Sequence, residues 1–255
     1  MKKIAAIIIT ISLLFPSLVG CQFDTPQVDD DTTYNTEQYT TTSEPQTTQP
    51  LTISPSDEDA IARAIEYELI PPELQHTYTE SITYKNFIDI IVVYLDLYYK
   101  HASKYNSLAD YIEREGLYKY NGEYYDGIND DNVKYTHVSK VLPYRGRVYE
   151  PHENLTRLEA AILFTNLYYM YGSSMAKTTE AGFNHHYADE AEMVDNYSIA
   201  EAGINLDAAR FMWEWGYLTG DENDNLHPHE LFTRGEACAV ICRIYERELE
   251  SWLRK

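Results

Sequence analysis

Three stretches of the chain carry the same apolar stripe. In each stretch the apolar residues are spaced i, i+3, i+4, i+7 and i+8, which predicts a helix with one buried face. The stripes are Phe87, Ile90, Ile91, Tyr94 and Leu95, then Ala160, Leu163, Phe164, Leu167 and Tyr168, then Ala237, Val240, Ile241, Ile244 and Tyr245. Each stripe begins four residues after a threonine, at Thr83, Thr156 and Thr233. The same face at the same distance from the same residue type indicates an internal repeat.

A ten-residue phrase leads into two of these stripes. The pattern P-H-E-x-[LF]-T-R-x-E-A occurs at 151–160 and again at 228–237. A divergent third copy at 78–87 keeps the apolar residue before Thr83 and has Lys85 near the arginine position, but it lacks the proline and the glutamate. The phrase therefore supports the repeat independently of the apolar pattern.

Shorter helical segments are expected upstream of each phrase. Residues 56–70 have an acidic first turn and apolar residues at helical spacing before Pro71. Residues 131–142 and 205–215 are the corresponding segments, the latter ending on Gly216, and 107–115 is an extra helix. The sequence thus predicts a mainly α fold made of helix-loop-helix units.

The first 20 residues read as an export signal. A short basic start is followed by an apolar stretch, 4–19, of the length that secretory signals have. The stretch ends in Leu18-Val19-Gly20-Cys21, which resembles the bacterial lipobox and implies that Cys21 is diacylated. Two acyl chains give stable anchoring in a membrane. The alternative is an ordinary signal peptide with a chance cysteine.

Residues 22–55 are rich in Thr, Gln, Asp and Pro and contain no Lys or Arg. Such a segment buries too little apolar surface to fold. As a flexible tether it would have a reach of about 30–35 Å. We therefore expect the lipidated Cys21 and a tether over 21–55, which hold the folded part near the membrane.

Composition narrows the classes of partner. The formal charge is -21, from 20 basic and 41 acidic residues, and this argues against a nucleic-acid partner. The 24 tyrosines suit half-buried positions and also surfaces that stack on sugars.

The phrases and their surroundings resemble the S-layer homology (SLH) domain over about residues 57–250. Repeats of that family run through an acidic, aromatic start, a helix, Gly-hydrophobic-hydrophobic-x-Gly, Phe-x-Pro and Thr-Arg-Ala-Glu. The third repeat matches with Tyr187-Ala188-Asp189, Gly216-Tyr217-Leu218-Thr219-Gly220, Leu226-His227-Pro228 and Thr233-Arg234-Gly235-Glu236. The second keeps Tyr149-Glu150-Pro151 and Thr156-Arg157-Leu158-Glu159, whereas the first, Thr83-Tyr84-Lys85-Asn86, lacks the arginine.

The resemblance implies three SLH-like repeats, at 56–105, 106–180 and 181–255, in a pseudo-threefold bundle with grooves between them. In the family the arginine of the motif holds an acidic cell-wall polysaccharide, often one with a pyruvate ketal. Carried over, this nominates Arg157 and Arg234, with Glu159 and Glu236 as organisers. Lys85 is a poor substitute, because an ammonium group lacks the planar fork that meets a carboxylate on two sides.

Helix capping explains part of the motif without any ligand. Thr156 with Glu159, and Thr233 with Glu236, have the spacing of a capping box. The arginine after each threonine is not favoured by the helix dipole. It either forms an anion site with free N–H groups at the helix end or makes a salt bridge between repeats. Both alternatives remain open at this stage.

Other candidate residues carry less information. Arg145 and Arg147 lie in a loop that would add cations near a groove or be solvated. Cys238 and Cys242 fit small core positions. The histidines at 185–186 and 227–229 do not have the spacing of metal ligands, and 221–225 resembles the start of a calcium loop but lacks its later glycine and glutamate.

We find no catalytic motif, and we expect no cofactor and no metal. The sequence favours a non-catalytic, lipid-anchored cell-surface protein, on the outer face of the cytoplasmic membrane of a Gram-positive-type bacterium, that binds an acidic cell-wall polysaccharide. The alternative is a degenerate SLH module that acts as a protein-interaction or accessory lipoprotein of the cell envelope.

Overall fold

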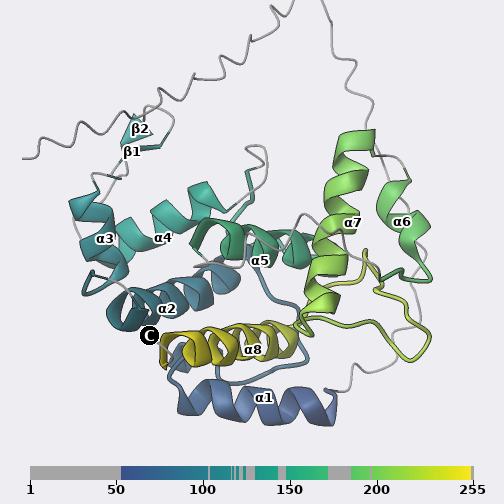
Figure 1. Ribbon diagram of the computed structural model, residues 1–255, viewed down its shortest axis with the longest axis horizontal. Coiled ribbons are helices and arrows are strands. Elements are labelled where there is room, and N and C mark those ends of the chain that lie inside the picture. The colour runs from purple at the N-terminus through teal and green to yellow at the C-terminus, as the bar shows by residue number, and fades with distance from the viewer. Residues whose placement is uncertain are drawn as a thin grey trace, which may run out of the picture. The chain divides into compact units, whose positions relative to one another are not determined.

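The computed structural model describes residues 53–253, except 103, 116, 118, 121–122, 125–129, 143–147, 172–184 and 196 (Figure 1). These residues belong to one compact unit, Thr48–Lys255. The expected signal peptide, Cys21 and nearly all of the tether lie outside the described residues. Among the described residues, no helix has both the length and the apolar character needed to cross a membrane.

The described part is mainly helical, as predicted. The helices are α1 (Pro55–Glu66), α2 (Tyr84–Ala102), α3 (Leu108–Arg114), α4 (Asp130–Val141), α5 (Arg157–Tyr171), α6 (Glu190–Val194), α7 (Ile199–Glu214) and α8 (Arg234–Leu253), with a 3₁₀ turn at Pro72–Leu74. A short antiparallel hairpin joins β1 (Lys119–Tyr120) to β2 (Glu123–Tyr124).

Two helix starts differ from the sequence prediction. Helix α1 is capped by the side chain of Ser54, two residues earlier than expected. Helix α7 begins at Ile199 because Ser198 and Glu201 form a capping box, so it starts six residues before the predicted Asn205. The five-residue α6 and the hairpin were not predicted, because elements this short show no clear periodicity.

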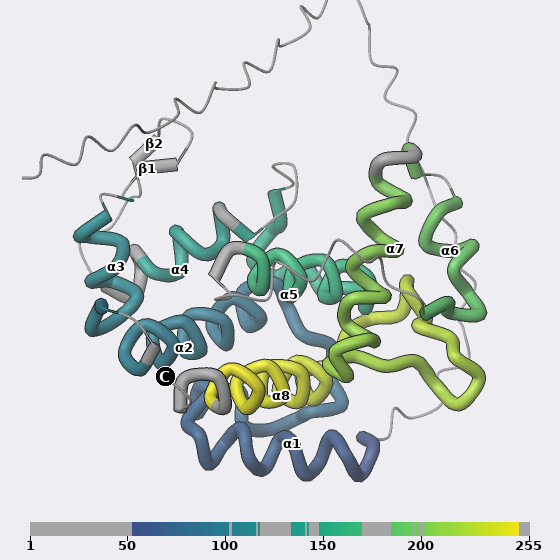
Figure 2. The backbone as a smooth tube through the Cα atoms, in the orientation of Figure 1, coloured from purple at the N-terminus to yellow at the C-terminus, as the bar shows by residue number. Residues whose placement is uncertain are grey.

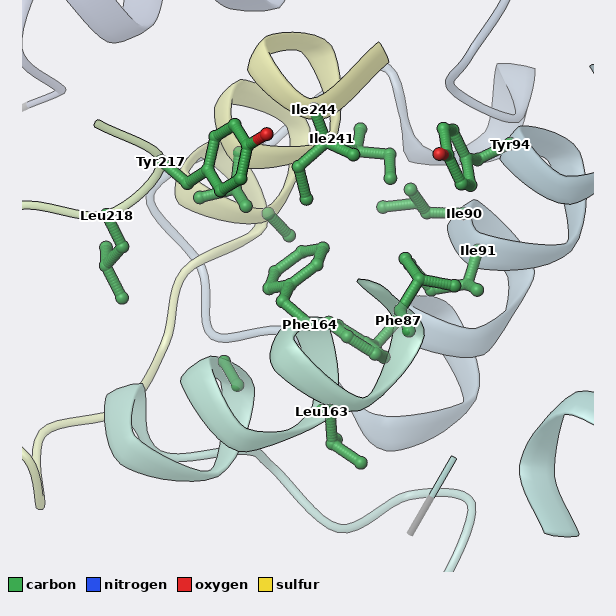
Figure 3. Packing of buried hydrophobic residues seen from close by; sticks show 14 of the residues in the cluster. Phe87, Ile90, Ile91, Tyr94, Leu163, Phe164, Tyr217, Leu218, Ile241 and Ile244 are labelled. Carbon is green, nitrogen blue, oxygen red and sulfur yellow. The ribbon is translucent and has the colours of Figure 1, made fainter. Parts of the chain in front are cut away.

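The long helices α2, α5 and α8 supply the core. All fifteen residues of the three stripes are buried, none more than 7% exposed. The ring of Phe87 lies 4.9 Å from that of Phe164, centre to centre, and Phe164 lies 6.2 Å from Phe232. Figure 3 shows side chains from all three helices converging on this centre. The predicted buried faces are confirmed.

The segments just before these helices hydrogen bond to one another in a closed ring. The N–H of Ile82 donates to the carbonyl of Phe232 (2.9 Å), that of Phe232 to Leu155 (2.8 Å), and that of Leu155 to Ile82 (3.2 Å). The side chains of these three residues are fully buried. Each segment therefore needs both of the others to satisfy its backbone.

The first N–H groups of each long helix continue this pattern. Those of Tyr84, Arg157 and Arg234 donate to the carbonyls of Glu153, Glu230 and Glu80, and the following residues Lys85, Leu158 and Gly235 donate to Pro151, Pro228 and Tyr78. A Cβ at Gly235 would lie 2.9 Å from the Tyr78 carbonyl oxygen, so the close approach requires glycine there. Helix ends that usually face water are thus tied to a neighbouring segment.

Helices outside this core pack against α2, α5 and α8. Helix α1 packs against α8, α4 against α2, and α7 against α5. Figures 1 and 2 show α1 lying alongside α8, although these are the first and last helices in the chain. The Arg63–Glu246 ion pair (2.5 Å) and the contact between the rings of Tyr67 and Tyr245 (5.3 Å) hold this pair of helices together.

Candidate functional site

Both predicted capping boxes are present. The carboxylate of Glu159 accepts from the Thr156 N–H (2.9 Å), and the Thr156 hydroxyl accepts from the Glu159 N–H (3.3 Å). In the other copy Glu236 accepts from the N–H and the hydroxyl of Thr233 (both 2.9 Å), and its own N–H donates back to that hydroxyl (3.1 Å). Thr156, Glu159, Thr233 and Glu236 therefore begin helices α5 and α8.

These caps bear on the first alternative for the arginines, an anion site made with free N–H groups at the helix ends. At the start of α5 the first two N–H groups bond to carbonyls of 228–230 and the third bonds to Thr156. The first three N–H groups of helix α8 are bonded in the same way, two to carbonyls of 78–80 and the third to Thr233. An anion site made of free N–H groups is therefore absent from both helix ends. Any binding by the arginines must come from their side chains.

The side chain of Arg157 contacts residues between Thr219 and Glu236. Its Nε donates to the Leu226 carbonyl (2.6 Å), its Nη2 donates to the Thr219 carbonyl (3.3 Å), and its Nη1 forms an ion pair with Glu236. The side chain is 12% exposed. Burial lowers the pKa of Arg157, and the neighbouring carboxylate of Glu230 opposes that shift. Of the two alternatives, the structure shows the salt bridge, which joins Arg157 of the first phrase to Glu236 of the second.

Arg157 lines a groove of about 350 Å³. The groove lies between the start of α1, the return loop 218–221 and one side of α8. Its lining residues are Ser54, Ser56, Asp57, Arg157, Leu218, Thr219, Gly220, Asp221, His227, Glu230, Glu236, Val240 and Arg243. We call it the Arg157 groove. It brings together residues that lie far apart in the sequence.

A second guanidinium, that of Arg243, stands in the same groove. It donates to the Tyr217 carbonyl (3.1 Å) and pairs with Asp57 at the start of α1. Arg243 lies outside the repeated phrase, so the phrase did not single it out. Its spacing could have pointed to it, because Arg243 and Asn166 each stand ten residues after the threonine of a phrase, Thr233 and Thr156. In the structure Asn166 likewise donates to a carbonyl at the end of a helix, that of Leu142 (2.7 Å).

Carboxylates outnumber cations along the groove. Asp221 accepts N–H groups of Asn225 (2.9 Å) and Asn223 (2.8 Å), which hold the pKa of its carboxyl well below its usual range. His227 lies 3.0 Å from Asp221 and 3.8 Å from Glu230. The backbone bonds to Asp221 show that 221–225 forms a turn.

Arg234 occupies a different environment, although it has the same place in the phrase. Its Nη1 donates to the His76 carbonyl (2.8 Å) and to the Thr77 hydroxyl, and its Nη2 lies 3.5 Å from Glu80. The side chain is 10% exposed and does not line the Arg157 groove. The two nominated arginines are thus not brought together.

The expected substitute Lys85 does not take the arginine's place. It is 56% exposed, pairs with Asp89 on the same helix (2.6 Å) and lies 5.7 Å from the centre of the Tyr135 ring. The residue that follows Thr83 is Tyr84, which is buried and donates from its hydroxyl to the Ser139 carbonyl (2.8 Å). Burial raises the pKa of Tyr84. An uncharged side chain therefore makes the contact between segments here.

The remaining candidate residues are three that lie outside the described residues and two buried cysteines. Arg145, Arg147 and Cys21 lie outside the described residues. Cys238 and Cys242 are free, fully buried thiols, and burial raises the pKa of each to about 12. Their prediction as core residues is confirmed. Within the described ranges, no group of three or more His, Cys, Asp or Glu residues could hold a metal ion.

Comparison with protein-family models and with curated proteins found no match to this chain.

Proposed function

We propose that this protein is a non-catalytic, lipid-anchored cell-surface protein that binds a cell-wall polysaccharide in the Arg157 groove. In this proposal the folded part consists of three SLH-like repeats in a pseudo-threefold bundle. The first repeat contributes α1 and α2, the second α4 and α5, and the third α7 and α8. The resemblance implies an acidic polysaccharide, possibly a pyruvylated one.

The repeat arrangement is supported by the cyclic contacts. Hydrogen bonds run from each of the three phrase segments to the next and close on the first. The helix packing follows the same rule, since the short helix of each unit covers the long helix of the preceding unit, with α1 on α8 closing the cycle. Three unrelated helical hairpins would have no reason to share this pattern.

Glycan binding is supported by one observation, the presence of two guanidinium groups and four carboxylates in a single open groove. A guanidinium has five N–H donors. Arg157 uses three of them, on Leu226, Thr219 and Glu236, and has others to offer. Sugar hydroxyls both donate and accept, so they can bond to the guanidinium and the carboxylate groups at once. A protein whose role is a wall attachment needs no catalytic residue.

Co-sedimentation with purified cell walls tests the proposal. The chain without its expected signal peptide, carrying Cys21→Ser, is mixed with walls and pelleted. Thr219→Trp places a large ring in the groove from an exposed position, and its matched control Asn223→Trp lies in the same loop outside the groove lining. We expect wild type and Asn223→Trp to pellet and Thr219→Trp to stay in solution. A wild-type protein that does not pellet would refute wall binding.

A second candidate is a degenerate module that binds an envelope protein. It is favoured by the internal pairing of both arginines, which leaves Arg157 and Arg234 only 12% and 10% exposed. The chain's charge of -21 suits a basic partner better than an anionic glycan. Capture of a specific envelope protein by the chain in the absence of walls, together with failure to pellet with walls, would support this candidate.

A further inference from the structure

We infer that the Arg157 groove selects an uncharged, hydroxyl-rich saccharide and discriminates against an anionic one. The inference rests on the proposed function and assigns its ligand class. It differs from the acidic polysaccharide that the resemblance implies, and it follows from how the charges of this groove are arranged.

Glu236 pairs with Arg157 and is held by its own helix cap. One carboxylate oxygen of Glu236 faces the guanidinium, and the other accepts from the N–H and the hydroxyl of Thr233, both at 2.9 Å. A ligand carboxylate would have to replace Glu236 at Arg157. Because the capping box fixes Glu236, that exchange would leave a second carboxylate beside the incoming one or would break the start of α8.

Arg243 supplies the other guanidinium of the groove. It is paired with one carboxylate oxygen of Asp57, and the other oxygen accepts from the Ser54 hydroxyl (2.8 Å) at the first turn of α1. Its Nη1 donates to the Tyr217 carbonyl (3.1 Å). Both cations of the groove therefore already face a carboxylate that the fold holds in place.

The side chains that line the groove carry more negative than positive charge. The lining contains two guanidinium groups, Arg157 and Arg243, against four carboxylates, Asp57, Asp221, Glu230 and Glu236. The formal sum of these six groups is -2. An anionic ligand would enter a negative groove on a chain of charge -21. Like charge in a partly desolvated site opposes binding.

An uncharged sugar meets none of these obstacles. Each guanidinium–carboxylate pair presents N–H donors beside carboxylate acceptors, a spacing that suits two neighbouring hydroxyls. The hydroxyl groups of Ser54, Ser56 and Thr219, all at exposed positions, add hydrogen-bond partners at the rim of the groove. The pairs remain intact while the ligand binds.

The experiment compares one glycan in two charge states. Oligosaccharides released from purified walls are separated into neutral and anionic fractions, and part of the anionic fraction has its carboxyl groups chemically reduced to alcohols. Binding of each fraction to the Cys21→Ser chain is measured by isothermal titration calorimetry. We expect the neutral and carboxyl-reduced fractions to bind at least about tenfold more tightly than the untreated anionic fraction. Thr219→Trp is expected to abolish binding and Asn223→Trp to preserve it.

A charge variant provides the complementary test. Glu236→Gln keeps an oxygen that accepts from Thr233 but releases Arg157 from its ion pair, so this variant is expected to gain about tenfold in affinity for the anionic fraction. Glu222→Gln removes the same charge from an exposed loop position outside the lining and is expected to change little. Circular dichroism checks that each variant is folded.

Different outcomes of these experiments test the ligand class and glycan binding itself. Tighter binding of the anionic fraction, weakened by carboxyl reduction and abolished by Thr219→Trp, would overturn the inference and leave glycan binding in place. Binding of no fraction would overturn both. An equal gain of anionic affinity in Glu222→Gln and Glu236→Gln would assign the discrimination to the overall field and remove the groove from it.

Discussion

The Arg234 side chain is predicted to act as a structural tie with no part in glycan binding. The perturbation is Arg234→Met, which keeps an unbranched apolar stem and removes the guanidinium. The variant loses the hydrogen bonds to the His76 carbonyl and the Thr77 hydroxyl, together with the ion pair to Glu80. All three partners lie in residues 76–80, so the change weakens the contact between this segment and the start of α8.

The magnitude follows from these contacts. A hydrogen bond from a charged donor contributes about 1.5–3 kcal/mol, so the two bonds together contribute about 3–6 kcal/mol. Glu80 is 62% exposed, and its pair with Arg234 adds at most about 1 kcal/mol. Against this, the buried Nε of Arg234 has no hydrogen-bond partner, and removing it recovers about 1–3 kcal/mol. Taking the middle of each range, the net expected loss is about 3 kcal/mol, or about 6–12 °C in Tm for a unit of this size.

Urea denaturation followed by circular dichroism measures this loss, and wall co-sedimentation measures function in the same variant. The matched control is Lys85→Met, which removes a cation that is 56% exposed and is expected to change stability by less than about 0.5 kcal/mol. An Arg234→Met protein as stable as Lys85→Met would refute the structural role. Normal stability with lost wall binding would make Arg234 a ligand residue.

Three further predictions concern buried groups. Tyr84→Phe removes the hydrogen bond to the Ser139 carbonyl and is expected to cost about 1–2 kcal/mol in urea denaturation, and an unchanged midpoint would contradict the role given to this hydroxyl. Burial lowers the pKa of His137 from 6.5 to about 4, so the unfolded chain takes up a proton first as the pH falls. Stability should drop by up to about 3 kcal/mol between pH 6.5 and 4, and His137→Gln, whose side chain does not titrate, should show a smaller drop. The thiols of Cys238 and Cys242 should react with a maleimide only after unfolding, since both are fully buried, and rapid labelling of the native protein at neutral pH would show that α8 opens.

Local signals in the sequence determined the three core helices and their buried faces. The three stripes depend only on the 3.6-residue period of a helix, and a capping box such as Thr233 with Glu236 reaches over three residues. Both features act within a turn or two of the chain, so they can be found without knowing the fold. The sequence pattern also identified the repeat, because the same short phrase occurs again.

The tertiary structure alone decided what the two arginines do. Arg157 and Arg234 occupy the same place in the same phrase, and the phrase itself does not show which contacts each will make. Their partners lie far away, at Leu226 for one and His76 for the other. Which of them lines a groove depends on side chains from other units, among them Arg243, that only folding brings together. A short phrase specifies a helix start, whereas the long-range contacts around it specify a site.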